Sequence, residues 1–96
     1  RIMNEGKARD SVLRAEKAEA LLRNELLTEA FDYLEQQFIQ AWRSSGIGEA
    51  EDRERIYQLS QNLEALKGYF QTVISDGKMA QSQIDEVKRR STFNKR

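Results

Sequence analysis

The chain has 96 residues, of which 39% are hydrophobic and 33% charged, and its 16 basic residues balance 16 acidic ones. It contains no cysteine, histidine or proline, which excludes disulfides, zinc fingers, thiol nucleophiles and imidazole acid–base chemistry, and favours long helices. No apolar run reaches the roughly 18 residues of a membrane-spanning helix. We therefore expect one cytoplasmic, all-α domain over residues 1–96, with no cofactor and no metal, frayed at residues 1–9 and 91–96.

A first helix is predicted over residues 10–44, capped by Asp10 or Ser11. Its apolar residues form two stripes that are one residue out of step: Ala8, Val12, Ala15, Ala18, Leu22 and Leu26, then Leu27, Phe31, Leu34, Phe38 and Ala41 or Trp42. Such a shift fits either one helix with a broad apolar face or a break near Asn24, where Asn24 would cap a second segment. The phase change favours a kink or a short break.

A turn is predicted at residues 43–48, where two glycines and two serines stand together. We expect a glycine there to end the first helix in the left-handed conformation. Acidic residues follow directly and suit the positive end of a second helix, predicted over residues 49–90. The two helices would form an antiparallel hairpin.

The second helix carries a heptad seam, the pattern that packs knobs into holes along another helix. Its predicted members are Ile56, Leu59, Leu63, Leu66, Phe70, Val73, Gly77, Ala80 and Ile84. Because the phase survives across Asp76-Gly77-Lys78, we predict a continuous helix with a close-packing point at Gly77. The alternative is a stop at Gly77 followed by a new helix.

The apolar residues outnumber the positions of one seam. Leu13, Leu21, Leu26, Ile39 and Ile74 remain outside it, and a two-helix core of this size is marginal. Either a third segment folds back or subunits associate, and we expect a homo-oligomer or an obligate protein partner. Aromatic and branched residues on the secondary faces are the candidate partner interface. These are Tyr33, Ile39, Trp42, Tyr57 and Tyr69.

The C-terminal stretch is basic, and Lys88, Arg89 and Arg90 are candidate nucleic-acid contacts. The same cations also suit the negative end of a helix without any ligand. A salt-sensitive gel shift that is lost on removal of residues 88–96 would favour nucleic-acid binding.

Three stretches resemble a group of short, uncharacterised helical proteins of tailed bacteriophages and prophages: LLRNELLTEAFDYLEQQFIQAWRSS, EDRERIYQLSQNLEALKGYF and VISDGKMAQSQI. The shared features are an AF…W helix, an acidic helix start and a G-K-x-A element, within residues 20–84. Some members have proline near residue 25 or 26, where this chain has Glu25 and Leu26. The resemblance implies a phage origin and brings no catalytic residue with it.

We interpret the chain as a non-enzymatic, oligomerising interaction protein. With a phage origin it would act in the host cytoplasm, in virion assembly, DNA packaging or host takeover, through protein–protein contacts. The alternative is a nucleic-acid-binding packaging component similar to a small terminase subunit.

Overall fold

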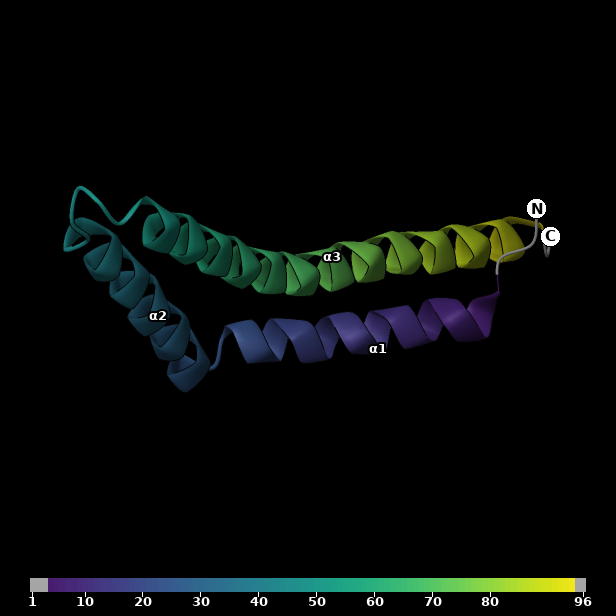
Figure 1. Cartoon of the computed structure of the whole chain (residues 1–96). Coiled ribbons are helices and arrows are strands. Elements are labelled where there is room, and N and C mark those ends of the chain that lie inside the picture. The colour runs from purple at the N-terminus through teal and green to yellow at the C-terminus, as the bar shows by residue number, and fades with distance from the viewer. Residues whose placement is uncertain (1–3, 95–96) are drawn as a thin grey trace. The chain divides into compact units, whose positions relative to one another are not determined.

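The protein is all-α in a computed structural model that describes the backbone of residues 4–94 and the side chains of residues 4–91. Three helices follow one another: α1 (Glu5–Leu22), α2 (Glu25–Arg43) and α3 (Ala50–Asn94) (Figure 1). The sequence predicted two. Among residues 4–94, no helix combines the length and the apolar content that crossing a membrane requires.

The helix predicted over residues 10–44 is in fact two helices, separated at Arg23 and Asn24. Asn24 has an extended backbone, with φ −70° and ψ 121°, and its side-chain oxygen accepts a hydrogen bond from the Leu27 N–H at 3.0 Å. This is the N-cap arrangement, which satisfies a backbone donor that the first turn of α2 leaves free. The change of apolar phase thus marks a break.

We expect Asn24→Ala to lower the free energy of unfolding by about 1 kcal/mol, because the Leu27 N–H loses its acceptor. Asn24→Asp keeps an acceptor and should stay within a few tenths of a kcal/mol of wild type. Urea unfolding followed by the fluorescence of Trp42, the chain's one tryptophan, measures both variants. Equal stabilities for the two variants would contradict the cap.

Helix α1 begins at Glu5, five residues before the predicted start. The Asn4 side chain accepts from the Lys7 N–H at 3.0 Å, and its carbonyl accepts from the Ala8 N–H at 3.0 Å. Asn4 therefore caps α1, and residues 5–9 are helical instead of frayed.

The turn after α2 does not use a left-handed glycine, since no described glycine has a positive φ. Serine hydroxyls bond the last carbonyls instead: Ser44 Oγ donates to the Gln40 carbonyl at 2.6 Å, and Ser45 Oγ to that of Trp42 at 2.7 Å. From α3, the Arg53 guanidinium donates to Ser45 Oγ and to the carbonyls of Gly46 and Ile47. The side chains of Ser44, Ser45 and Arg53 thus replace the glycine cap.

Helix α3 passes through Gly77 without a break, as the preserved heptad phase predicted. It also continues to Asn94, so residues 91–94 are helical, and residues 95–96 lie outside the described part. Glycine inside a helix costs about 1 kcal/mol relative to alanine. A neighbouring helix explains its presence, because a Cβ added at Gly77 would lie 2.1 Å from the Cβ of Ala15 and 2.9 Å from the Ser11 carbonyl oxygen.

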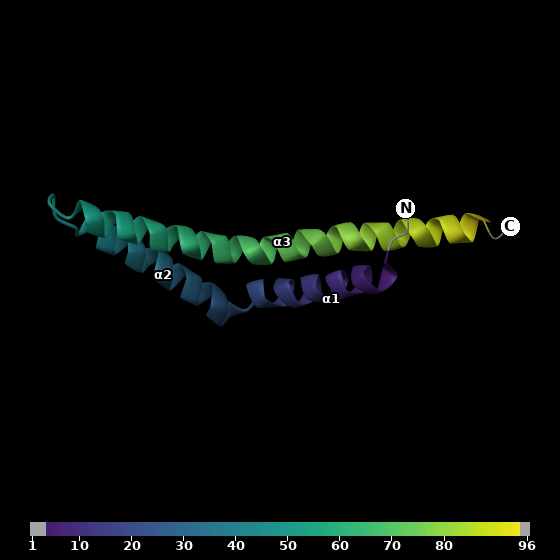
Figure 2. The same ribbon diagram turned by 45° about the vertical axis from the view of Figure 1, so that its right-hand side comes forward.

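The domain expected over residues 1–96 contains two compact units. Unit 1 comprises the described parts of residues 1–21 and 70–96, and unit 2 comprises residues 22–69. In unit 1, α1 lies beside the second half of α3, and small side chains form the contact: Ala8 and Ala80 are buried with Ile84 (Figure 2). In unit 2, α2 pairs with the first half of α3, and Phe31 and Leu63 are the buried apolar residues.

Candidate interaction surface

Helix α2 separates its charged residues from its uncharged ones. Each residue turns the helix by about 100°, which places all the charged side chains on one half: Glu25, Glu29, Asp32, Glu35 and Arg43. The opposite half has no charge from end to end: Leu26, Leu27, Ala30, Tyr33, Leu34, Gln37, Phe38, Gln40 and Ala41. A solvated helix face in a chain that is 33% charged would normally include some of those charges.

The partner segment of α3 is equally poor in charge. Between residues 56 and 75 only Glu64 and Lys67 are charged. Lys67 Nζ lies 2.6 Å from Glu35 Oε2 and 3.7 Å from Glu64 Oε2, so both charges belong to one ion-pair network. One side is therefore left uncharged on α2 and on α3 from residue 56 onward, whereas Asp52 and Arg55 lie in the groove of Ala41 and Leu59 near the loop.

The register of α2 against α3 brings these two uncharged sides together. Lys67 meets Glu35 near the middle of the pair, and Ala41 and Leu59 line one groove near the loop. One heptad farther from the loop on each helix stand Leu34 and Leu66. Because residues seven apart share a helix side, Leu34 lies across from Leu66 on the side of Ala41 and Leu59. We call these four residues the uncharged face.

The uncharged face is exposed although its residues belong to the apolar seams. The exposed fractions are 41% for Leu34, 49% for Leu59 and 48% for Leu66. The heptad prediction placed Leu59 and Leu66 inside the seam. In the structure Ser60 and Lys67 are more buried than these leucines, since α2 covers the neighbouring stripe. The α2–α3 contact thus buries only half of each seam.

The remaining predicted seam positions lie along the inner side of α3. Leu63, Gly77, Ala80 and Ile84 are buried, whereas Ile56, Phe70 and Val73 are half-buried. Ile74, which the sequence left outside the seam, is buried in unit 1. Leu13, Leu21, Leu26 and Ile39, the other residues that the seam did not accommodate, are exposed.

Lys67 contacts a carboxylate and an aromatic ring of α2 within unit 2. The hydrogen bond to Glu35 raises the pKa of Lys67 above its ordinary 10.5, against the effect of partial burial. Its ammonium also lies 5.9 Å from the centre of the Phe31 ring, within the range of a cation–π contact. A raised lysine pKa means that the folded state holds the proton more tightly. The raised pKa of Lys67 therefore contributes its full stabilisation of the folded state below pH 10.5. This stabilisation is lost as the pH rises through the folded-state pKa.

The five residues predicted as a partner interface are all exposed, but they do not form one surface. Tyr33 and Tyr69 lie on the uncharged side of their helices. Ile39 lies on the other side, in a groove with Ser60 and Glu64. Tyr57 also lies on that side of α3, and Trp42 is at the end of α2.

The predicted nucleic-acid contacts are exposed on the last turns of α3, but two of them have acidic partners. Glu86 lies 2.9 Å from the Arg89 guanidinium and 3.3 Å from that of Arg90. Such ion pairs reduce the positive potential that a phosphate backbone would meet. Nucleic-acid binding by Lys88, Arg89 and Arg90 stays a prediction.

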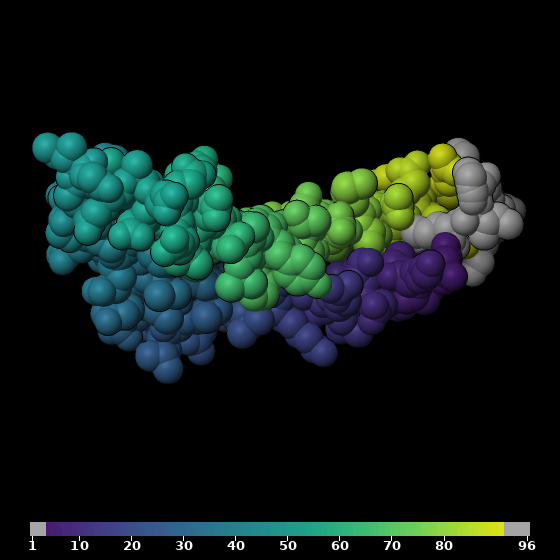
Figure 3. Space-filling view, viewed as in Figure 1, coloured from purple at the N-terminus to yellow at the C-terminus, as the bar shows by residue number. Residues whose placement is uncertain are grey.

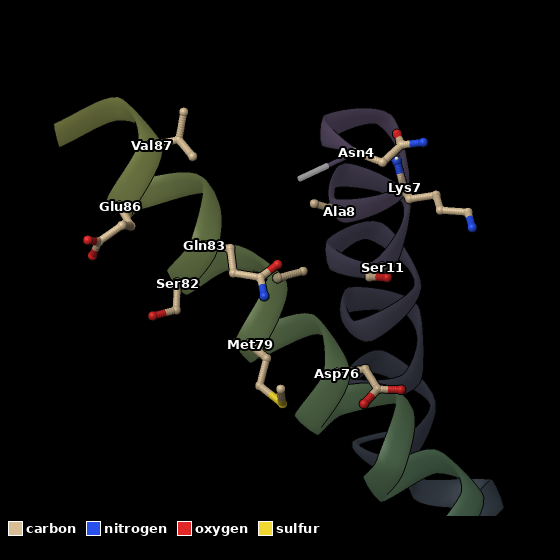
Figure 4. A pocket seen from close by; sticks show the side chains of 11 residues that line it. Asn4, Lys7, Ala8, Ser11, Asp76, Met79, Ser82, Gln83, Glu86 and Val87 are labelled. Carbon is tan, nitrogen blue, oxygen red and sulfur yellow. Dashed lines mark hydrogen bonds between the residues drawn. The ribbon is translucent and has the colours of Figure 1, made fainter. Parts of the chain in front are cut away.

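A groove of 760 Å³ lies between α1 and α3 in unit 1 (Figure 4). Gln83 and Val87 turn toward α1, whereas Ser82 and Glu86 point away from it. The small side chains of Ala8 and Ala80 also line the groove. Among the described residues, no group of histidine, cysteine, aspartate or glutamate is placed to hold a metal ion.

The sequence predicted Leu34 and Ala41 as members of an apolar stripe, but not as part of the candidate partner interface. The signal that would have placed them on an open surface is the segregation of charge around α2. No protein-family model matches the chain, and no curated protein or solved structure matches it.

Proposed function

We propose that the chain is a non-enzymatic interaction protein that acts by binding another protein surface at the uncharged face of unit 2. One observation carries the proposal: Leu34, Leu59 and Leu66, which belong to helix-packing seams, are 41% to 49% exposed. Exposed contiguous apolar surface in a soluble protein is typical of protein–protein contacts. From the phage resemblance we further propose partners in virion assembly, DNA packaging or host takeover.

The exposed leucines continue the apolar seams of α2 and α3, which supports a contact with another protein more strongly than scattered exposed leucines would. A helix that contacts one neighbour needs apolar residues at two positions of each heptad. A helix inside a larger bundle needs apolar residues at a third position as well. On α3 the residues facing α2 are Ile56, Ser60, Leu63 and Lys67, and Leu59 and Leu66 supply the third position. Unit 2 therefore has the pattern of a helix pair that packs against further helices.

Site-specific photo-crosslinking tests this function in the cells that produce the protein. A photoreactive amino acid at Leu66 should give covalent protein adducts, because the uncharged face would be in contact with a partner. The same group at Gln61, which is exposed on another side of α3, is the matched control. An adduct at Leu66 that exceeds the one at Gln61 supports the proposal. Equal labelling at both positions, or no protein adduct at Leu66, contradicts it.

A further inference from the structure

We infer that a groove between the charged half of α2 and α3 binds a basic amphipathic helix of a partner protein. This is a second surface of unit 2, on the other side from the uncharged face, and the inference does not depend on the proposed function. The groove measures 330 Å³ and is lined by Glu35, Phe38, Ile39, Ser60, Leu63 and Glu64. We call it the acidic groove. In the space-filling view α2 and the first half of α3 touch along unit 2, so a ligand of the groove would lie on the surface of the helix pair (Figure 3).

Half of the residues that line the acidic groove are apolar. Leu63 is buried, Phe38 is half-buried, and Ile39 has an exposed fraction of 42%. A groove along two packed helices has the shape that the apolar side of a third helix fills. The apolar contact of the acidic groove therefore suits a helix better than a small ion.

The polar residues of the groove have an excess of negative charge. Glu35 and Glu64 share one cation, Lys67, whose Nζ lies 2.6 Å and 3.7 Å from their carboxylates, so this network has a net charge of −1. Asp32 stands seven residues before Ile39 and therefore lies on the same side of α2, where it adds a second negative charge. The basic residue of this half of α2, Arg43, is at the loop end of the helix. The charge along the groove thus favours a cationic ligand.

The acids of α2 also repel one another. Glu25, Glu29, Asp32 and Glu35 follow at spacings of four, three and three residues, at which like charges destabilise a helix. Elsewhere the described helices compensate their acids, since Glu5, Asp52 and Glu86 each pair with an arginine three or four residues later. Among the described residues, Glu35 is the one acid of α2 with an ion-pair partner. Cations from a bound helix would offset the repulsion that remains.

The formal charge of the neutral chain is divided between its two units. Unit 2 has nine acidic and five basic residues, whereas the sequence of unit 1 has seven acidic and eleven basic ones. An acidic unit attracts basic partners at long range and disfavours acidic ones. Together with the apolar groove residues, this charge specifies a helix that has one apolar side flanked by lysine or arginine.

The test uses a fluorescent synthetic amphipathic helix of leucine and lysine, titrated with the full chain at low salt and followed by fluorescence anisotropy. Wild type should bind this peptide. The same peptide with glutamate in place of lysine should bind at least about 10-fold more weakly, because its charge matches that of the groove. Absence of binding by the lysine peptide, or equal binding of both peptides, would overturn the inference.

Two groove variants locate the contact. Asp32→Asn combined with Glu64→Gln should weaken binding of the lysine peptide about 5-fold or more, because two carboxylates that face its cations lose their charge. Ile39→Ser should weaken it by a similar factor through lost apolar contact. Far-UV circular dichroism should show the helix content of wild type for both variants. Wild-type affinity in both variants contradicts the inference.

Two controls separate the groove from net charge and from the uncharged face. Glu51→Gln combined with Glu54→Gln removes the same charge from exposed residues of α3 that do not line the groove, and should change the affinity less than about 2-fold. Leu66→Gln alters the uncharged face and should bind the peptide like wild type. If the two double variants weakened binding equally, net charge alone would attract the peptide. If Leu66→Gln abolished binding while the groove variants retained it, the peptide would occupy the uncharged face. Either outcome overturns the inference.

Discussion

Gly77→Ala should lower the free energy of unfolding by about 1–3 kcal/mol, although alanine is the better helix former by about 1 kcal/mol. The new methyl carbon would stand 2.1 Å from the Ala15 Cβ and 2.9 Å from the Ser11 carbonyl oxygen. A flexible side chain could rotate out of its way, but one of these atoms is backbone and the other is fixed to it. The two helices of unit 1 must therefore separate, and the buried contacts around Ala80 and Ile84 loosen. Overpacking outweighs helix propensity here.

Gly68→Ala is the matched control, because it is the same substitution on the same helix. A Cβ at Gly68 has nothing within 4 Å, so only the gain in helix propensity remains. We expect a stabilisation of about 0.5–1 kcal/mol, and hence a gap of about 1.5–4 kcal/mol between the two variants. Urea unfolding by far-UV circular dichroism measures both. Equal stabilisation by the two alanines would show that α1 does not approach Gly77 closely.

A double variant locates the clash. Adding Ala15→Gly to Gly77→Ala removes the nearest atom, and should recover part of the lost stability. The two substitutions should then couple by about 1 kcal/mol or more, because residues in direct contact are not additive. Strict additivity would mean that the cost of Gly77→Ala arises elsewhere in unit 1.

Features with a local physical cause were readable from the sequence. The break at Asn24 has two local signals, a change of apolar phase and a residue suited to cap the next helix. The continuity of α3 follows from the phase kept across Gly77. The start of α1 was wrong for a related reason, because Asn4 and Asp10 are equally good caps, and the apolar pattern does not decide between them.

The apolar pattern of one helix could not predict features that depend on a second helix. Leu59 and Leu66 have the better apolar spacing, yet Ser60 and Lys67 face α2. The reason lies on α2, where Glu35 takes the ammonium of Lys67 at 2.6 Å and Phe31 offers its ring. A periodicity in α3 carries no information about this ion pair. The charge-free half of α2 was present in the sequence, but only the register against α3 showed that Leu34 and Leu66 share a side.

Phe31→Ala should have the largest effect on unit 2, a loss of about 3–5 kcal/mol in the free energy of unfolding. Phe31 has an exposed fraction of 9% and is the one buried residue of α2. Its loss removes ring burial and leaves a cavity that the two helices cannot easily close. The ring also lies 5.9 Å from the Lys67 ammonium, but a partly exposed cation–π contact contributes only about 0.5–1 kcal/mol. Burial therefore dominates. The fluorescence of Trp42, which lies in unit 2, follows the loss directly during urea unfolding.

Three further variants separate ring burial from the charge contacts around it. Tyr33→Ala removes an exposed aromatic residue two positions away and should cost about 0.5 kcal/mol or less. Phe31→Leu keeps most of the apolar volume and should cost less than about 1.5 kcal/mol. Lys67→Met keeps the apolar stem while removing the ammonium, and should cost no more than about 1 kcal/mol, since the pair with Glu35 is one-third exposed.

If Lys67→Met were as costly as Phe31→Ala, the ion pair would be the main stabilising contact of unit 2. If Tyr33→Ala were as costly, the exposed Tyr33 would stabilise unit 2 as much as the buried Phe31 does, and burial would not be the dominant cause. The expected order, with Phe31→Ala far below the other three in stability, follows because apolar burial is worth several kcal/mol and a partly solvated ion pair is not.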